Sequence, residues 1–198
     1  MKKNVIISLA DSNYFELLNE LIDSIKRFEE SKNIAICILN AGLKNNEIES
    51  LSKKVDEIKD ANWDIEVPKH KIGQKEWLKS QVSRAFIPNY FPGYDKYLWI
   101  DADAWVNSWD AIELYFKGCN NNRLAIATSA DRSYGRVLRA EWFLKSLATI
   151  KSQNYKHAKS SGFSEKIARK VALMPHLNIG VFSLEKNAPH WQVWQKNL

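Results

Sequence analysis

Short apolar runs and helix-like stretches alternate along the first hundred residues of the chain. The runs Val5–Ala10 and Ile34–Leu39 are rich in β-branched residues and predict buried strands. Between them, apolar residues from position 15 to 28 recur every three or four positions, which predicts an amphipathic helix. Asp11 and Ser12 precede that helix, and both are residue types that cap helix N-termini.

The same alternation continues as far as residue 128. Strands that are apolar on both faces and alternate with helices indicate an α/β fold with a mostly parallel, Rossmann-like sheet. The patterns predict a helix over 48–58, a strand over 63–67, a helix over 77–87, a strand over 97–100, a helix over 109–116 and a strand over 124–128.

The periodicity is weaker after Asp131. Residues 136–150 predict a helix, and residues 155–164 predict a basic loop. Residues 177–184 predict a late strand, and the segment 190–194 predicts the start of a last helix.

Composition is that of a globular protein: 198 residues, 45% of them hydrophobic, with 8 tryptophans. A chain of this size buries enough surface to fold without a disulfide or a structural metal. Cys37 lies inside an apolar run and predicts a buried structural thiol. The longest apolar run is Ile34–Leu39, too short to cross a bilayer, and the run after Lys3 is too short for a signal peptide. We therefore expect a cytoplasmic protein.

The net charge of +6 is distributed unevenly. Residues 1–117 carry 16 basic and 19 acidic side chains, whereas residues 118–198 carry 13 basic and 4 acidic ones. Such asymmetry favours an anionic partner for the second half: nucleic acid, a membrane surface or a phosphorylated substrate. A solvated basic surface without a partner is the alternative. No RNA- or DNA-binding motif is present, so we expect no nucleic-acid partner.

The strongest chemical signal is the pair Asp101 and Asp103, which directly follows the apolar strand predicted over 97–100. Side chains two positions apart on a strand leave on the same face, and open α/β sheets bind ligands at the carboxyl ends of their strands. Two adjacent carboxylates repel each other unless a cation lies between them, and hard oxygen ligands suit Mg²⁺ or Mn²⁺. The alternative is that both aspartates are cap or turn residues.

Two chemistries use an Asp-x-Asp pair in this way. A metal-dependent phosphatase of the haloacid-dehalogenase type would use Asp101 as its nucleophile. In such phosphatases the motif normally lies near the chain start and carries Thr or Val two residues after the second aspartate. Here the pair lies in mid-chain, and Trp105 occupies that position. Nucleotide-sugar glycosyltransferases carry the pair in mid-chain, after a half built of strands and helices. The second pattern matches this sequence better.

The chain resembles the GT-A fold glycosyltransferases, and most of all glycosyltransferase family 8. Four segments carry the resemblance, in the expected order: 5–11 resembles the first strand, 83–88 a helix with an arginine, 97–106 the Asp-x-Asp strand and 177–182 the later Asn-x-Gly strand. The resemblance implies a single GT-A-like domain over 1–198. Within it, 1–117 would bind the nucleotide, and 118–198 would be a basic acceptor-side half, shortened at its C-terminus.

The resemblance also implies roles for particular residues. Asp103 would be the main metal ligand, and Asp101 would contact both the metal and the donor ribose. Arg84 would pair with donor phosphate or sugar, for which a guanidinium suits better than an ammonium. The remaining positions would bind substrate: Ala10 and Asp11 the nucleotide, Asn178 and Gly180 the donor sugar or acceptor, and Asp131 the sugar hydroxyls. Asp11 is equally a helix cap, and both roles can hold.

These observations predict a metal-dependent glycosyltransferase. It would use Mn²⁺ or Mg²⁺ and take a nucleotide-diphosphate sugar, with UDP favoured. The resemblance to family 8 implies that it would transfer the sugar with retention of configuration. The basic half predicts an anionic glycan or lipid acceptor, or docking on the inner face of an acidic membrane. Members of the family generally carry a histidine after the Asn-x-Gly strand that completes the metal site, and we assign no histidine of this sequence to that role. A non-catalytic nucleotide-sugar-binding module therefore stays open as an alternative, beside the phosphatase.

Overall fold

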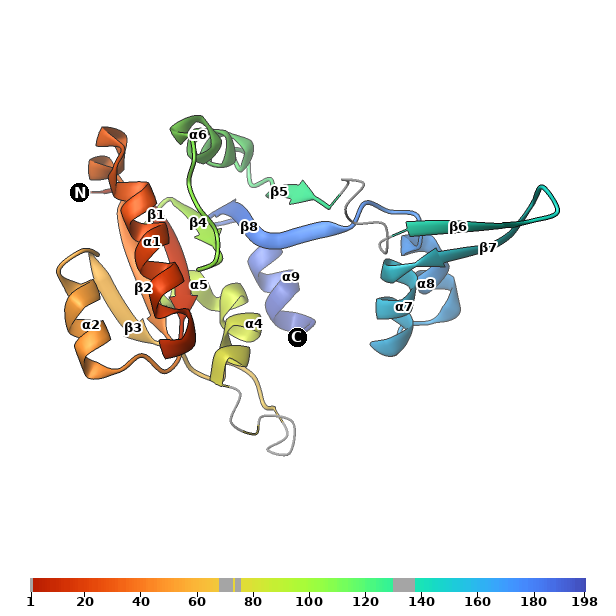
Figure 1. The fold of residues 1–198 in the computed structure, drawn as a ribbon, viewed down its shortest axis with the longest axis horizontal. Coiled ribbons are helices and arrows are strands. Elements are labelled where there is room, and N and C mark those ends of the chain that lie inside the picture. The colour runs from red at the N-terminus through yellow and green to blue at the C-terminus, as the bar shows by residue number, and fades with distance from the viewer. Residues whose placement is uncertain (1, 68–72, 74–75, 130–137) are drawn as a thin grey trace. The chain divides into compact units, whose positions relative to one another are not determined.

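A computed structural model describes residues 2–67, 73, 76–129 and 138–198 of the chain. Its strands are β1 (Asn4–Ala10), β2 (Ala35–Asn40), β3 (Glu57–Asp60), β4 (Lys96–Ile100), β5 (Ala125–Thr128), β6 (Leu138–Phe143), β7 (Ser146–Ser152) and β8 (Leu177–Glu185) (Figure 1). Its α-helices are α1 (Phe15–Lys26), α2 (Asn45–Ser52), α4 (Lys79–Ser83), α5 (Ile87–Tyr90), α6 (Trp109–Gly118), α7 (Gln153–Ser160), α8 (Glu165–Val171) and α9 (His190–Lys196). Within the described ranges, none of the helices has both the length and the apolar character that a bilayer crossing requires.

The chain divides into two compact units. The first unit comprises Met1–Ala125 and Gly180–Leu198, and the second comprises Ile126–Ile179. The antiparallel hairpin of β6 and β7 belongs to the second unit, together with α7 and α8. The single domain expected over 1–198, with halves meeting at residue 117, stays a prediction.

The main sheet has the strand order β3-β2-β1-β4-β8-β5. β1 pairs in parallel with both β2 and β4, and β2 pairs in parallel with β3. β8 runs antiparallel to β4. The expected α/β fold with a mostly parallel sheet is therefore confirmed. Because β1 has β2 on one side and β4 on the other, the carboxyl ends of β1 and β4 form a topological switch point, where such sheets bind ligands.

One face of this sheet is covered by α1 and α6 (Figure 1). Alternate strand positions point to this face, because side chains on a strand alternate between its two sides. The amphipathic pattern predicted for residues 15–28 is what turns α1 toward the sheet. The fully apolar cluster that results includes Ile6, Ile36, Ile38 and Leu98 from the strands, Leu18, Leu21, Ile22 and Ile25 from α1, and Trp109, Ile112 and Phe116 from α6.

The opposite face of the sheet is aromatic. The Trp99 and Phe182 rings stack with their centroids 6.5 Å apart, and Trp191 on α9 contacts both Phe182 and Tyr97 edge-on. Trp194, three positions further along α9, packs edge-on against Phe182 at 5.5 Å. These contacts dock α9 onto β4 and β8, so the aromatic side chains of this region serve the core.

The third strand lies earlier than the sequence predicts. The predicted helix over 48–58 ends at Ser52, and β3 begins at Glu57 and pairs with β2. The strand predicted over 63–67 is wrong. The edge of β2 pairs with the earlier segment Glu57–Asp60, and this pairing outweighs the short alternating pattern. The segment after β3 is held by Tyr90, whose hydroxyl accepts from the Asn62 backbone N–H and donates to Asp64.

The helix predicted over 77–87 is broken into shorter pieces. A 3-10 turn precedes α4, and a second 3-10 turn at Arg84–Phe86 separates α4 from α5. Pro88 does not end the helical segment but stands in the first turn of α5, where its missing N–H leaves no hydrogen bond unmade. The result places Arg84 at the bend.

The helix predicted over 136–150 is also wrong, since residues 138–152 form the β6–β7 hairpin. The apolar positions of this segment are compatible with helical spacing, but the turn at Leu144–Lys145 divides the segment into two strands. The residues of these strands form cross-strand pairs instead of helical contacts. The basic loop predicted over 155–164 is largely α7, which Ser152 caps by accepting from the Tyr155 backbone N–H. Residues 136–137 of the predicted helix lie outside the described residues.

Removal of the Trp191 side chain tests the docking of α9. Trp191 is 4% exposed, and its Nε1 donates to the Glu185 backbone carbonyl at 2.9 Å. We expect Trp191→Ala to lower the free energy of unfolding by about 3–5 kcal/mol, because it empties a packed aromatic site. Val193→Ala on the same helix, at a side chain that is 62% exposed, should change it by less than about 0.5 kcal/mol. Urea denaturation followed by circular dichroism measures both, and equal losses would contradict this packing.

Candidate functional site

A cavity of about 400 Å³ opens at the carboxyl ends of β1 and β4, within the first unit. Five residues predicted from the sequence line it: Ala10 and Asp11 after β1, Arg84 at the bend after α4, and Asp101 and Asp103 after β4. The register aligns Ile7 of β1 with Trp99 of β4, so the segments that follow these two strands leave the sheet close together. The structure thus brings these five side chains to one place, while their roles stay predictions.

Asp101 is fixed by two donors that bind the same oxygen. Arg84 donates from Nη2 to Asp101 Oδ1 at 2.8 Å, and Trp99 donates from Nε1 to the same atom at 2.7 Å. The Arg84 guanidinium also lies over the Trp99 ring, 4.9 Å from its centroid. The three side chains therefore hold one another, and the Asp101 carboxylate has one defined orientation at the cavity wall.

Burial sets the electrostatics of this group. The Arg84 side chain is only 5% exposed and the Asp101 side chain 33% exposed. Burial raises the pKa of Asp101, and the nearby Arg84 and the Trp99 hydrogen bond oppose that rise, while Asp103 adds to it. Burial lowers the pKa of Arg84, and the two aspartates oppose that shift. Each charge thus needs the other, because a buried charge without a partner is costly.

Asp103 is exposed and lines the same cavity as Asp101. Two hard carboxylates at one cavity edge are the donor type that Mg²⁺ and Mn²⁺ prefer. With Asp101 Oδ1 engaged by Arg84 and Trp99, these side chains fit a divalent cation bound through their other oxygens. Among the described residues there is no cluster of three or more His, Cys, Asp or Glu side chains.

Asp11 is a cap residue, as its position predicts. Its side chain accepts from the backbone N–H groups of Asn13 and Tyr14, and so opens the 3-10 turn that leads into α1. Ser12 donates its backbone N–H to the carbonyl of Gly42, whose φ of +129° suits glycine. These bonds fix the end of β1 at the cavity, where a nucleotide could contact Asp11.

The structure brings only part of the remaining predicted residues, Asn178, Gly180 and Asp131, to the site. The Gly180 carbonyl accepts from the Asp101 backbone N–H at 2.8 Å, so β8 supports the strand end that carries the aspartates. Asn178 lies on β8 within the second unit, and its role in the site stays a prediction. Asp131 lies outside the described residues.

Sequence reasoning missed Trp99 and the outer wall of the cavity. Trp99 and Asp101 are two positions apart along β4, so the same spacing that pairs the aspartates also puts the indole N–H beside a carboxylate. This two-residue spacing is visible in the sequence, but a tryptophan in an apolar strand usually indicates a core residue and not a hydrogen-bond donor to a site. Trp77 and Tyr14, which are 45% and 46% exposed, also line the cavity and offer aromatic surface there.

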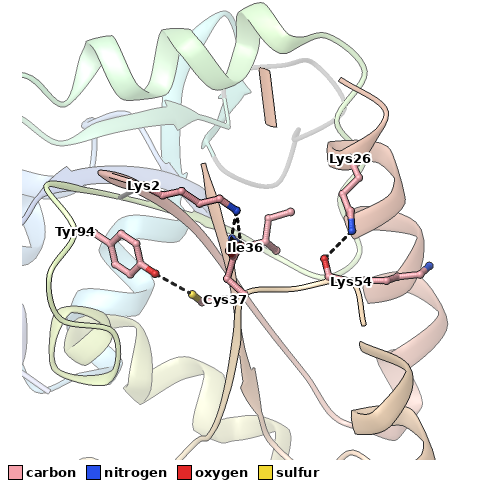
Figure 2. Close-up of polar contacts among 7 residues, drawn as sticks. Lys2, Lys26, Ile36, Cys37, Lys54 and Tyr94 are labelled. Carbon is pink, nitrogen blue, oxygen red and sulfur yellow. Dashed lines mark hydrogen bonds and ion pairs between the residues drawn. The ribbon is translucent and has the colours of Figure 1, made fainter. Parts of the chain in front are cut away.

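The cysteines take no part in this site. Cys37 is fully buried in β2, and burial raises the pKa of its thiol to about 12. Figure 2 shows its sulfur directed at the Tyr94 hydroxyl, 3.8 Å away, whereas the hydrogen bond from Lys26 to the Lys54 carbonyl lies on the other side of β2. A thiol with so little thiolate is a poor nucleophile, so the prediction of a buried, structural thiol is consistent with its surroundings.

Comparison with known families identifies one match. The segment 5–183 matches the model of glycosyl transferase family 8. This segment includes the whole cavity wall described above. No curated protein matches the chain.

Solved glycosyltransferase structures share the fold. The galactosyltransferase LgtC, solved with donor and acceptor sugar analogs, has a TM-score of 0.58 at 16% identity, over 97% of this chain and 59% of that chain. The bifunctional glycosyltransferase WbbM has a TM-score of 0.57 at 20% identity, over 96% and 32%. The mannosyltransferase Ktr4p from S. cerevisiae, solved with GDP, has a TM-score of 0.53 at 10% identity, over 98% and 60%. These likenesses show the GT-A fold, and this chain spans 59% of the length of LgtC.

The Trp99 hydrogen bond can be removed while its ring is kept. We expect Trp99→Phe to weaken the binding of UDP with Mn²⁺ by roughly 10- to 150-fold, because Asp101 loses a donor worth about 1.5–3 kcal/mol for a charged acceptor. Trp109→Phe, at an indole that is 8% exposed and packs on Phe28, is the matched control and should bind as the unmodified chain does. Titration calorimetry measures both. Equal affinity in the two variants would show that the Trp99 N–H does not orient Asp101.

Proposed function

The chain belongs to glycosyl transferase family 8, and from this membership we propose that its β1–β4 cavity binds a nucleotide-diphosphate sugar for glycosyl transfer. The observation that carries the proposal is the meeting of Asp11, Arg84, Asp101 and Asp103 around one cavity at the switch point of the sheet. The family match sets aside the phosphatase, which would need Asp101 as a nucleophile. Asp101 is instead held between Arg84 and Trp99.

Asp101 and Asp103 would hold the Mn²⁺ or Mg²⁺ ion. When bound, such an ion screens the diphosphate of the donor and stabilises it as a leaving group. The protein's own part is to keep one Asp101 oxygen turned toward Arg84 and Trp99, which leaves the carboxylate a single way to face the cavity. Exposed Asp103 completes the acidic edge.

Other residues would bind the donor. Arg84 reaches the cavity beside Asp101, and its planar guanidinium would bind donor phosphate or sugar while it keeps the ion pair. Ala10 and Asp11, at the end of β1, would contact the nucleotide. Asn178, Gly180 and Asp131 keep the sugar-pocket roles that the family resemblance implies.

We further propose UDP as the nucleotide, transfer with retention and an anionic glycan or lipid acceptor. The first two follow from the family resemblance. The third rests on the charge of the chain, since residues 118–198 carry 13 basic against 4 acidic side chains. The solved structures that share this fold include a galactosyltransferase and a mannosyltransferase, so the fold is compatible with more than one donor sugar.

A thermal-shift panel tests the proposed function. UDP-, GDP- and CMP-linked sugars are compared with and without Mn²⁺. One donor at about 100 times its Kd should stabilise the chain by about 2.7 kcal/mol, a rise in Tm of several degrees, and only with the metal present. The rise should vanish in Asp103→Ala and persist in Glu113→Ala, at an exposed carboxylate on α6 that pairs with Lys117.

The panel also separates the alternatives. A metal-dependent shift without turnover toward any acceptor would favour the binding module. A metal-dependent shift that is unchanged in Asp103→Ala would contradict the proposed site.

A further inference from the structure

The β6–β7 hairpin ends in an unusual turn. Phe143 pairs with Ser146 at the ends of the two strands, and the two residues between them, Leu144 and Lys145, have φ values of 48° and 65°. Two-residue turns of this left-handed kind usually take Asn-Gly or Asp-Gly, because larger side chains strain the backbone there. Strained backbone in non-glycine residues often marks a functional position.

The turn is also the most exposed apolar point of the chain among the described residues. Leu144 is 82% exposed and its neighbour Phe143 is 68% exposed. Figure 1 shows the turn projecting beyond α7 and α8 of the same unit. Large apolar side chains at a projecting tip contribute a favourable free energy only when a binding partner removes them from water.

The second unit, to which this tip belongs, is rich in basic side chains. The described residues of that unit carry 8 basic and 2 acidic side chains. Both acidic groups are already paired: Glu141 contacts Lys151 at 2.7 Å and Arg139 at 3.8 Å, while Glu165 contacts Arg169 and Lys159. The described part of this unit therefore combines an exposed apolar tip with an excess of positive charge.

We propose that the turn Phe143–Leu144–Lys145 inserts into the interface of a bilayer that contains anionic lipid. A tip with two apolar side chains is far smaller than the roughly 800 Å² that each partner of a stable protein complex buries, so it fits lipid better than a protein surface. Phe and Leu would enter the acyl boundary, while Lys145 and the other basic side chains would contact anionic headgroups. The inference rests on the anionic-partner part of the proposed function and places the chain beside a lipid-borne acceptor.

Vesicle co-sedimentation tests this docking. We expect the chain to bind phosphatidylcholine vesicles containing about one third phosphatidylglycerol, to bind pure phosphatidylcholine at least roughly tenfold more weakly, and to be released as salt rises to about 0.5 M. The double variant Phe143→Ser, Leu144→Ser should lose at least roughly tenfold in partitioning. Leu114→Ser, at a side chain that is 69% exposed on α6 of the first unit, should partition as the unmodified chain does.

Three results would overturn the proposal. They are no binding to anionic vesicles, binding that the double variant keeps, and a concentration-dependent self-association that the double variant abolishes, which would identify a second copy as the occupant. Circular dichroism and the metal-dependent nucleotide shift establish that the double variant is folded. Vesicle binding can fail while that shift persists, so failure of the docking is distinct from failure of the proposed function.

Discussion

The bond on which the site depends is the ion pair between Arg84 and Asp101. The two residues come from different parts of the fold, the bend after α4 and the end of β4, and meet at 2.8 Å with Trp99 donating to the same carboxylate oxygen. Arg84 is almost fully buried, so removal of Asp101 would take away the carboxylate that offsets part of the cost of burying its charge. In the proposed site, one carboxylate would thus both bind the metal and maintain the local fold.

The sheet explains why the pair lies at a ligand-binding place. Parallel pairing of β1 with β2 and β4 creates a switch point, and antiparallel β8 closes the other side of β4. The Gly180 carbonyl accepts the Asp101 N–H, so the strand end is held from the backbone as well as from the side chain. Trp99 lines the cavity and stacks on Phe182, so it joins the cavity wall to the aromatic core. Rigid support of this kind is what pre-organises a binding site.

Much of this arrangement could be predicted from sequence, because apolar runs fix strands such as Val5–Ala10 and the Asp-x-Asp spacing fixes two side chains on one face. The Arg84–Asp101 contact could not, since no local pattern joins residues 17 positions apart. The strand expected over 63–67 failed because tertiary contacts with Tyr90 outweighed a short alternation. The helix expected over 136–150 failed because a turn at Leu144–Lys145, with backbone angles unusual for those residues, was not visible in the sequence.

We propose that Asp101, held by Arg84 and Trp99, and Asp103 bind the metal of a nucleotide-sugar site. Anomalous X-ray scattering from crystals grown with UDP and Mn²⁺ tests it most directly. We expect a manganese peak within coordination distance of oxygens of both aspartates, roughly 2.0–2.6 Å by analogy with other hard divalent cations, with Asp101 Oδ1 still bonded to Arg84 and Trp99. A manganese peak remote from both carboxylates, with UDP bound elsewhere, would contradict it.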